Sequence, residues 1–433
     1  MSDRTTQQSR VEFALPPRHG RMPRHGALRT TAKTAASVIA VLAVSAAAIV
    51  AYAAVDLFAS VKPPVQLESE KMLEGVPDIG AMEGGLNFLL VGSDKRPEDG
   101  AFGDPDVESA TLNDVTMLLH ISQDHSHVEV VSFPRDLIVS VPECPNPEDP
   151  EGEPLPALSE AKINEVLAWG GLGCVASTVE ELTGVGIPVG GIVEFYGVAA
   201  LSSAVGGVEV CVAEPISDDY TGTYLDAGIH TLSGMEALQF LRTRHGVGDG
   251  SDLGRISNQQ TFLASLMRTM QSSGTLGDPV KLYSIAKAVL SNMTLSNKMQ
   301  DPAQLMSIAR TLQDVDLSKI AFVQYPTAYT DGFGAVVPSE SAAFVNAALQ
   351  ADRPVVIDPN ATSGADFGTV TDPNAPPEPG TPAPATPAPV DPSATPVDPS
   401  AAPGPDAPTA EALPGDVTGQ TAAEVRCSSA NEG

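Results

Sequence analysis

The stretch LQFLRTRHGVGDGSDLGRISNQQ, from Leu238 to Gln260, joins an apolar run to an amphipathic helix. It concentrates charged and amide side chains: Arg242, Arg244, His245, Asp249, Asp252, Arg255, Gln259 and Gln260. Burying so many charges costs free energy unless they meet a multiply charged ligand. Arginine presents planar, paired donors that match phosphate oxygens. The stretch therefore predicts a bound phosphate or pyrophosphate, and the alternative is a surface network of salt bridges.

Charge is distributed unevenly along the 433 residues, whose formal net charge is −30. Residues 1–33 carry seven basic side chains against two acidic ones, and the remainder is strongly acidic. An acidic surface repels a phosphate backbone, so the composition argues against general nucleic-acid binding.

Residues 35–55 read AASVIAVLAVSAAAIVAYAAV and contain no charged side chain. A helix of about 20 residues spans the hydrocarbon core of a bilayer, so this run predicts a transmembrane helix. The basic segment 1–34 before it is expected to remain cytoplasmic, which places the rest of a single-pass protein outside the cell membrane. The run is longer than the usual core of a cleaved signal peptide, which is the alternative.

Four further segments follow from composition and periodicity. Residues 56–84 contain prolines and glycines and are expected to form a stalk. Residues 85–272 mix short branched apolar runs with helical patterns, which is typical of an α/β domain. Residues 273–358 are expected to be a helical C-terminal extension of that domain. Residues 359–433, dominated by Pro and Ala up to about 407, are expected to be a disordered tail.

Individual elements are expected within the α/β domain and its extension. Strands are predicted at 86–91, 115–121, 128–133, 189–195, 208–212 and 320–325. Helices are predicted at 162–169, 175–182, 255–270, 279–291, 302–313 and 339–349. Ser233 is expected to cap another helix, because Ser-x-x-Glu is a capping box.

The four cysteines are Cys144, Cys174, Cys211 and Cys427. Outside the membrane they would meet oxidising conditions. Cys144 and Cys174 bracket a short stretch and are the favoured disulfide, while a bridge between Cys211 and Cys427 stays open because sequence does not fix connectivity. The spacing does not resemble a zinc site.

Acidic side chains flank the first two predicted strands. Asp94 and Arg96 follow the first strand in VGSDKR, and Asp114 precedes the second in LNDVTML. If these strands are neighbours, Asp94 and Asp114 project at the same edge and repel each other unless a cation lies between them. Mg²⁺ suits such a pair together with ligand phosphates. The alternative is that either aspartate caps a turn.

Basic side chains lie at two further element ends. Arg135 follows Pro134 at the end of the third strand, where proline removes a ladder donor and directs the chain out of the sheet. Lys162 and Asn164 open the next predicted helix. A helix N-terminus favours anions, so its dipole does not explain Lys162, whereas a ligand phosphate does. The alternative is a solvated lysine.

The order of these motifs resembles the LytR–CpsA–Psr (LCP) family of cell-wall enzymes over residues 85–272. The resemblance lies in VGSDKR, NDVTMLLHIS, VSFPRDLIVSVP, KINEVLAWGG, AVGGVEVCV and GIHTLSGMEALQFLRTRHGVGDGSDLGRISNQQ. The NQQ ending, the DGSD insertion and the cysteines are similar to the forms found in high-GC Gram-positive (actinobacterial) bacteria. The resemblance implies an LCP-type fold, in which helices flank a mixed central β-sheet.

The resemblance also implies a magnesium-dependent phosphotransferase. Family members move a glycopolymer from an undecaprenyl-pyrophosphate carrier to N-acetylmuramic acid of peptidoglycan, and a phosphodiester results. By similarity, Asp94 and Asp114 would hold Mg²⁺ and Asp252 would orient an arginine or activate the acceptor. The expected pyrophosphate-binding residues are Arg135, Arg242, Arg244 and Arg255, with Arg96, Lys162, Asn164 and Gln259 as further substrate contacts.

The carrier lipid would need an apolar slot between the sheet and its helices. Candidates for its wall are Phe88, Leu90, Met117, Leu119, Ile192, Phe195, Phe262 and Leu266, and each could instead be plain core. Two other functions remain open: a non-catalytic wall-binding or scaffolding protein with the same fold, and a polyprenyl-pyrophosphate hydrolase.

Overall fold

The computed structural model describes residues 27–73, 85–95, 111–149, 152–272, 275, 278–331, 334–358, 361 and 410–431. The chain divides into one unit ending at Asp56 and a second beginning at Leu57. Helix α1 (Ala27–Ala59) supplies the described part of the first unit. Among the described residues, Thr30–Ala59 is the one helical segment long and apolar enough to cross a membrane, and it is longer than the predicted run 35–55.

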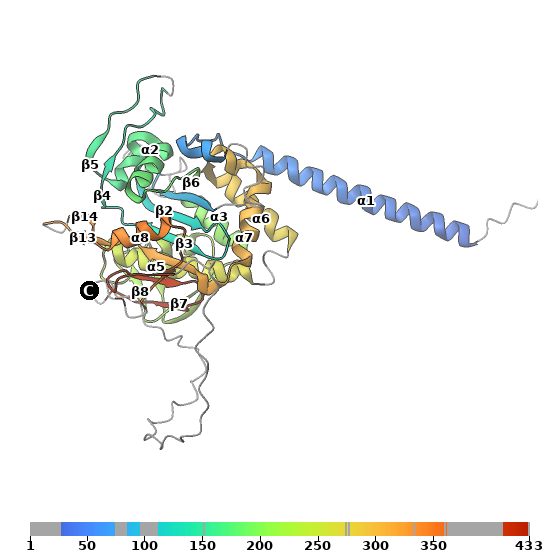
Figure 1. Cartoon of the computed structure of the whole chain (residues 1–433). Helices are drawn as coiled ribbons and strands as arrows, with labels where there is room; N and C mark the ends of the chain where they lie inside the picture. Colours follow the sequence, from blue (N-terminus) through green and yellow to red (C-terminus); the bar gives the residue numbers. More distant parts are fainter. Residues whose placement is uncertain are drawn as a thin grey trace, which may run out of the picture. The chain divides into compact units, whose positions relative to one another are not determined.

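A seven-stranded mixed sheet organises the second unit (Figure 1), with strand order β11-β6-β1-β2-β3-β12-β17. Its strands are β1 (Leu86–Ser93), β2 (Asn113–Ile121), β3 (Val128–Phe133), β6 (Val189–Val193), β11 (Met293–Leu295), β12 (Ile320–Gln324) and β17 (Gly419–Thr421). β1 pairs antiparallel with β2 and parallel with β6, and β3 pairs parallel with β12. Continuous apolar runs form these strands because helices cover both faces of the sheet, and branched side chains pack well between a sheet and its helices.

Helices cover the two faces of this sheet, as Figure 1 shows for α2 and α5. On one face, Leu89, Leu118 and Val131 pack with helices α2 (Val166–Thr183) and α8 (Ala342–Gln350). On the other face pack helices α5 (Asp252–Gln271), α6 (Pro279–Asn292) and α7 (Pro302–Asp314). Removing one such buried leucine side chain costs about 2–5 kcal/mol, so these contacts fix the position of each helix.

A smaller sheet, with strand order β10-β7-β18, packs on α5. It contains β7 (Val208–Val212), β10 (Gly228–Leu232) and β18 (Cys427–Ser428). The other helices are α3 (Phe195–Val205), α4 (Met235–Arg242), η1 (Glu68–Leu73), η2 (Ile163–Glu165), η3 (Asn297–Gln300) and η4 (Leu317–Lys319). Short pairs are formed by β4 (Ile138–Val141) with β5 (Leu158–Lys162), β8 (Ile216–Asp218) with β9 (Thr223–Leu225), β13 (Thr327–Tyr329) with β14 (Val336–Pro338), and β15 (Val355–Val356) with β16 (Glu411–Ala412).

The expected stalk is wrong for residues 57–73. Leu67 and Leu73 are buried in the two main cores, with 2% and 5% exposure. The Glu70 carboxylate accepts a hydrogen bond from the Lys298 backbone at 3.0 Å. Prolines nearby indicated a linker, but the apolar residues between them pack on the domain. The rest of the expected stalk, residues 74–84, lies outside the described residues.

The expected disordered tail is wrong for residues 410–431. There β17 pairs with β12 at the edge of the central sheet, and β18 pairs with β7. A disulfide joins Cys427 to Cys211, with a Cα–Cα distance of 4.4 Å. The short segment does not need its own core, because its strands pair with strands of the domain. Of the remaining tail, residues 359–360, 362–409 and 432–433 lie outside the described residues.

The expected helical extension at 273–358 is in fact integral to the domain. It supplies α6, α7 and α8, but also β11 and β12 of the central sheet. The predicted cap at Ser233 is also wrong, because Gly234 precedes α4 and gives no side-chain cap. The serine that does cap a helix is Ser251, whose hydroxyl accepts from the Leu253 backbone at the start of α5.

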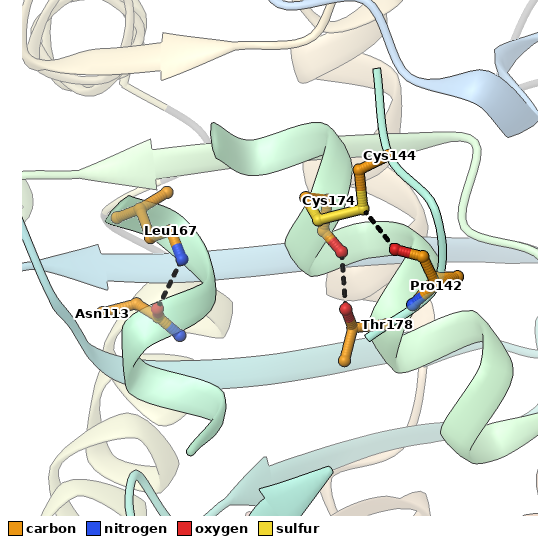
Figure 2. The surroundings of a disulfide bond; sticks show 6 residues. All are labelled: Asn113, Pro142, Cys144, Leu167, Cys174 and Thr178. Carbon is orange, nitrogen blue, oxygen red and sulfur yellow. Dashed lines mark hydrogen bonds between the residues drawn. A yellow bond between two sulfur atoms is a disulfide. The ribbon is translucent and has the colours of Figure 1, made fainter. Parts of the chain in front are cut away.

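The predicted disulfide between Cys144 and Cys174 is present and ties the segment after β4 to α2 (Figure 2). α2 is broken at Gly170 and Gly171, between the two helices predicted at 162–169 and 175–182. Gly171 has a φ of 68°, and a Cβ at Gly170 would lie 2.8 Å from the Cys174 sulfur. Nearby, the Leu167 backbone donates to the Asn113 side chain at 3.2 Å, which fixes α2 over the start of β2.

Candidate active site

A cavity of about 330 Å³ lies on the face of the sheet covered by α5. The ends of several elements that are distant in sequence form it. Its lining includes Leu90, Gly92, Ser93, Asp114, Met117, Arg135, Val193, Glu194, Phe195, Val198, Asp218, Tyr220, Leu238, Leu241, Arg242, Arg244, His245, Arg255, Gln259 and Leu263. The cavity thus brings together nine predicted residues: Leu90, Asp114, Met117, Arg135, Phe195, Arg242, Arg244, Arg255 and Gln259.

Asp114 joins two of the arginines. Arg135 Nη1 lies 3.0 Å from its Oδ1, and Arg255 Nη1 lies 3.7 Å from its Oδ2. The Arg255 guanidinium also donates to the Asp114 backbone carbonyl at 2.6 Å. Because the Arg255 side chain is only 8% exposed, these carboxylate and carbonyl contacts offset part of its desolvation cost. Asp114 therefore fixes both guanidinium groups at the cavity.

Asp252 supports the same two arginines from outside the cavity lining. Its Oδ1 lies 2.5 Å from Arg255 Nη2, and its Oδ2 accepts a hydrogen bond from the Arg135 backbone at 3.1 Å. Burial alone would lower the pKa of Arg135, but the charges of Asp114 and Asp252 raise it above its ordinary value. Asp252 thus lies where it orients arginines, one of the two roles expected for it.

Asp218 is a site residue that the sequence reasoning missed. Its side-chain oxygens accept hydrogen bonds from the Thr243 hydroxyl at 2.6 Å and from the Arg244 backbone at 3.2 Å. Burial would raise the pKa of Asp218, but these bonds, with backbone bonds from Tyr220 and Thr221, lower it below its ordinary value. The ionised carboxylate holds the backbone that carries Arg244. Asp218 ends a three-residue strand, which is too short to recognise by alternation.

The cavity lining also contains apolar side chains. Of the predicted wall residues, Leu90, Met117 and Phe195 line it, beside Val193, Val198, Leu238, Leu241 and Leu263. The Arg242 guanidinium lies 4.3 Å from the centre of the Phe195 ring, so one of the arginines packs directly on an apolar lining residue. Phe195 begins α3 and does not end a strand as predicted.

The other predicted wall residues do not line the cavity. Phe88 and Leu119 pack against the core beneath α5–α7, and Ile192 packs against the opposite core. Phe262 is 3% exposed and lies with Leu266 in the core of the smaller sheet. On α5 the positions facing the cavity are Arg255, Gln259 and Leu263, spaced by four residues, whereas Phe262 points about 100° away.

Lys162 and Asn164 also lie away from the cavity lining. Lys162 ends β5 and is also the N-cap residue of the 3-10 helix η2, as predicted, and its ammonium binds the Asp136 carboxylate at 2.7 Å. Asn164 is buried, and its backbone donates to the Arg135 carbonyl at 3.2 Å, so it supports the turn that carries Arg135. Arg96 lies outside the described residues.

The expected magnesium ligands lie at the same end of the paired strands β1 and β2. Asp94 is partly engaged as a turn residue, because its Oδ1 accepts from the Leu112 backbone at 2.7 Å. Asp114 and Ser93 present oxygen atoms at the cavity. Within the described ranges no group of three or more His, Cys, Asp or Glu residues could hold a metal. These oxygens fit Mg²⁺ only if phosphate and water complete its coordination, which is its usual mode.

Comparison with known proteins identifies the family. Residues 58–350 match the model of the LytR_cpsA_psr family. The chain is 30% identical over 283 residues to the Corynebacterium glutamicum protein named "Cell wall biosynthesis protein LcpA", covering 60% of this chain and 53% of the relative. It is 26% identical over 215 residues to the Bacillus subtilis protein named "Polyisoprenyl-teichoic acid--peptidoglycan teichoic acid transferase TagT", covering 48% of this chain and 59% of the relative.

One solved structure is reported beside these relatives. A LytR-Csp2A-Psr enzyme from Actinomyces oris is 22% identical, with a TM-score of 0.48, and the match covers 62% of this chain and 90% of that one. The chain spans about half the length of the curated relatives it matches first. Since the family match extends over more than half of the sequence, the chain belongs to the LytR_cpsA_psr family.

Proposed function

We propose that this protein is a membrane-anchored phosphotransferase that moves a glycopolymer from an undecaprenyl-pyrophosphate carrier to N-acetylmuramic acid of peptidoglycan, forming a phosphodiester. The observation that carries the proposal is one cavity lined both by Arg135, Arg242, Arg244 and Arg255 and by a set of apolar side chains. A lipid diphosphate has matching anionic and apolar parts. The transferase name of the Bacillus subtilis relative supports this reaction.

The arginines would bind the diphosphate oxygens through paired donors. Phosphoryl transfer depends mainly on positioning and on neutralising charge, which fixed guanidinium groups provide. Asp114 and Asp252 hold Arg135 and Arg255 in place before substrate arrives, so little reorganisation is needed. Leu90, Met117 and Phe195 would contact the lipid next to the diphosphate.

Mg²⁺ is part of the proposal. Asp114 would bind it from the cavity, with Asp94 at the adjoining strand end, and bound Mg²⁺ would neutralise charge on the diphosphate. Arg244 and Arg242 would bind other oxygens of the diphosphate, and Asp218 fixes the backbone at Arg244.

The proposed orientation places the cavity outside the cell. The basic residues before α1 would remain in the cytoplasm, following the positive-inside rule. Two disulfides in the second unit support an oxidising compartment. Peptidoglycan and the membrane-borne carrier would both be reached from there.

The test uses the full chain in detergent with a polyprenyl-pyrophosphate-linked sugar, Mg²⁺ and peptidoglycan. Asp114→Ala and Arg244→Ala should each lower transfer by about 10²–10³-fold, because each removes charge fixed at the transferring phosphate. Arg310→Ala and Asp314→Ala are matched controls, since both side chains are exposed on α7. Thermal unfolding should show that all four variants fold. Normal transfer by the two site variants would reject the assignment.

A further inference from the structure

A second cavity, of about 360 Å³, lies beside the first. Its lining shares no described residue with the first cavity. It includes Pro134, Asp136, Ser251, Asp252, Tyr329 and Gly334. These residues come from the turn after β3, the start of α5 and the β13–β14 pair.

The two cavities adjoin at Arg135 and Asp252. Arg135 lines the first cavity, while its neighbours Pro134 and Asp136 line the second. Asp252 lines the second cavity, and it binds the Arg135 backbone and the Arg255 guanidinium of the first. A group bound in the second cavity would therefore lie next to the proposed diphosphate site.

The outer side of the second cavity is held in place by specific contacts. The Lys162 ammonium binds Asp136 at 2.7 Å and donates to the Gly334 carbonyl at 3.0 Å. The Val336 backbone donates to the Asp136 carbonyl at 3.1 Å. These bonds tie the β13–β14 pair to the turn that carries Arg135. Lys162, expected from sequence to contact substrate, here supports the second cavity.

The lining suits an uncharged, hydroxyl-rich ligand. Its charged side chains are the carboxylates Asp136 and Asp252, and each is already bound to a cation, so the lining offers no unpaired charge to a second phosphate. Carboxylates and Ser251 accept hydrogen bonds from hydroxyl groups. Tyr329, which is 47% exposed, offers an aromatic face to the C–H side of a sugar ring.

The order of groups along α5 fits an in-line displacement. Ser251–Leu253 line the second cavity, and Arg255, Gln259 and the apolar Leu263 line the first, in that order along the helix. From Asp252 to Leu263 the helix rises roughly 16 Å. A nucleophile in the second cavity would therefore approach the diphosphate from the side opposite the lipid, as in-line transfer requires.

We propose that the second cavity binds the acceptor sugar of the peptidoglycan glycan chain, an inference that rests on the proposed function. The acceptor hydroxyl oxygen attacks the phosphorus that carries the glycopolymer, and a new P–O bond forms. The bond from that phosphorus to the bridging oxygen breaks, and polyprenyl monophosphate leaves with the electron pair. The hydroxyl proton passes to the Asp252 carboxylate.

Gly334→Trp tests the cavity by filling it. A Cβ at Gly334 meets no heavy atom within 4 Å, so the new side chain has room to be accommodated. In the transfer assay with full chain, Gly334→Trp should raise the KM for an uncrosslinked glycan oligosaccharide about tenfold and leave the KM for the lipid-linked donor unchanged. Tyr329→Ala should also raise the KM for the glycan oligosaccharide. Gly415→Trp is the control, because Gly415 lines neither cavity and its Cβ would meet only the Asp358 carboxylate, at 3.8 Å.

Direct binding separates this inference from the proposed function. Calorimetric titration of the same oligosaccharide should show binding to the wild-type chain and to Gly415→Trp, and loss of binding in Gly334→Trp. If neither the wild type nor any variant transfers the glycopolymer but this binding pattern holds, the transferase function is wrong and the glycan site is correct. An unchanged glycan affinity in Gly334→Trp and Tyr329→Ala, or an equal rise in donor KM, would overturn the inference.

Discussion

Asp114 connects the arginines from two distant parts of the chain, because it binds both Arg135 and Arg255. Charge content and strand-end position were enough to select these residues from sequence. The sequence did not show which side chains point into the cavity. Phe262 and Leu263 are neighbours on α5, yet only Leu263 lines it. Asp94 was equally ambiguous, because a carboxylate after a strand can bind its own loop, and one of its oxygens does.

At the residue scale, His127 provides a prediction about pH. Its side chain is 2% exposed, and its Nδ1 lies 2.9 Å from the Glu129 carboxylate. Burial lowers the pKa of His127, but the hydrogen bond and charge of Glu129, with the charges of Asp352 and Asp124, raise it overall above 6.5. A raised pKa in the folded state stabilises the protein below the ordinary value of about 6.5, and this contribution is lost as pH rises through the folded pKa.

We therefore expect the free energy of unfolding to fall as pH rises from about 6 to about 8, and to fall less in His127→Gln. Urea titrations across this pH range measure the free energy of unfolding of the wild type and of His127→Gln. His230→Gln is the control, because that ring binds only the Asp226 carbonyl among the described residues. Equal pH slopes in the wild type and His127→Gln would contradict the expectation.

At the scale of elements, the bounds of β3 and β7 agree with the predicted runs 128–133 and 208–212. Both are continuous branched apolar runs that carry a strong strand signal. The pairs β4–β5 and β8–β9 were missed because β4, β8 and β9 have only three or four residues, and because β5, with the sequence LSEAK, is mostly polar. The strands β17 and β18 were missed for another reason: two or three residues after a proline-rich stretch form strands only because β12 and β7 offer edges.

The two disulfides should differ in their effect on stability. Cys211–Cys427 spans 216 residues and Cys144–Cys174 spans 30. In the chain-entropy model these loops contribute roughly 5 and roughly 4 kcal/mol, so the longer one should matter more. Replacing both members of each pair by alanine should lower the urea midpoint more for Cys211 and Cys427, which also hold β18. The reverse order, or no change, would show that residues 410–431 bind without the covalent link.

At the scale of the whole molecule, the sequence predicted the α/β class, the apolar N-terminal helix and most members of the cation cluster. It did not predict how the domain is completed. Residues 57–73 and 410–431 pack on the domain although their composition is typical of linkers and tails. Composition indicates whether a segment can fold alone, whereas these two segments are ordered by packing on surfaces formed elsewhere in the chain.

The most direct measurement is the mass of the product that the full chain makes from a polyprenyl-pyrophosphate-linked sugar and peptidoglycan. The account predicts a glycan fragment carrying the sugar through one phosphodiester on muramic acid, together with polyprenyl monophosphate. Free sugar phosphate as the sole product would indicate a hydrolase. Unreacted donor, with peptidoglycan merely bound, would indicate a wall-binding protein and would contradict the account.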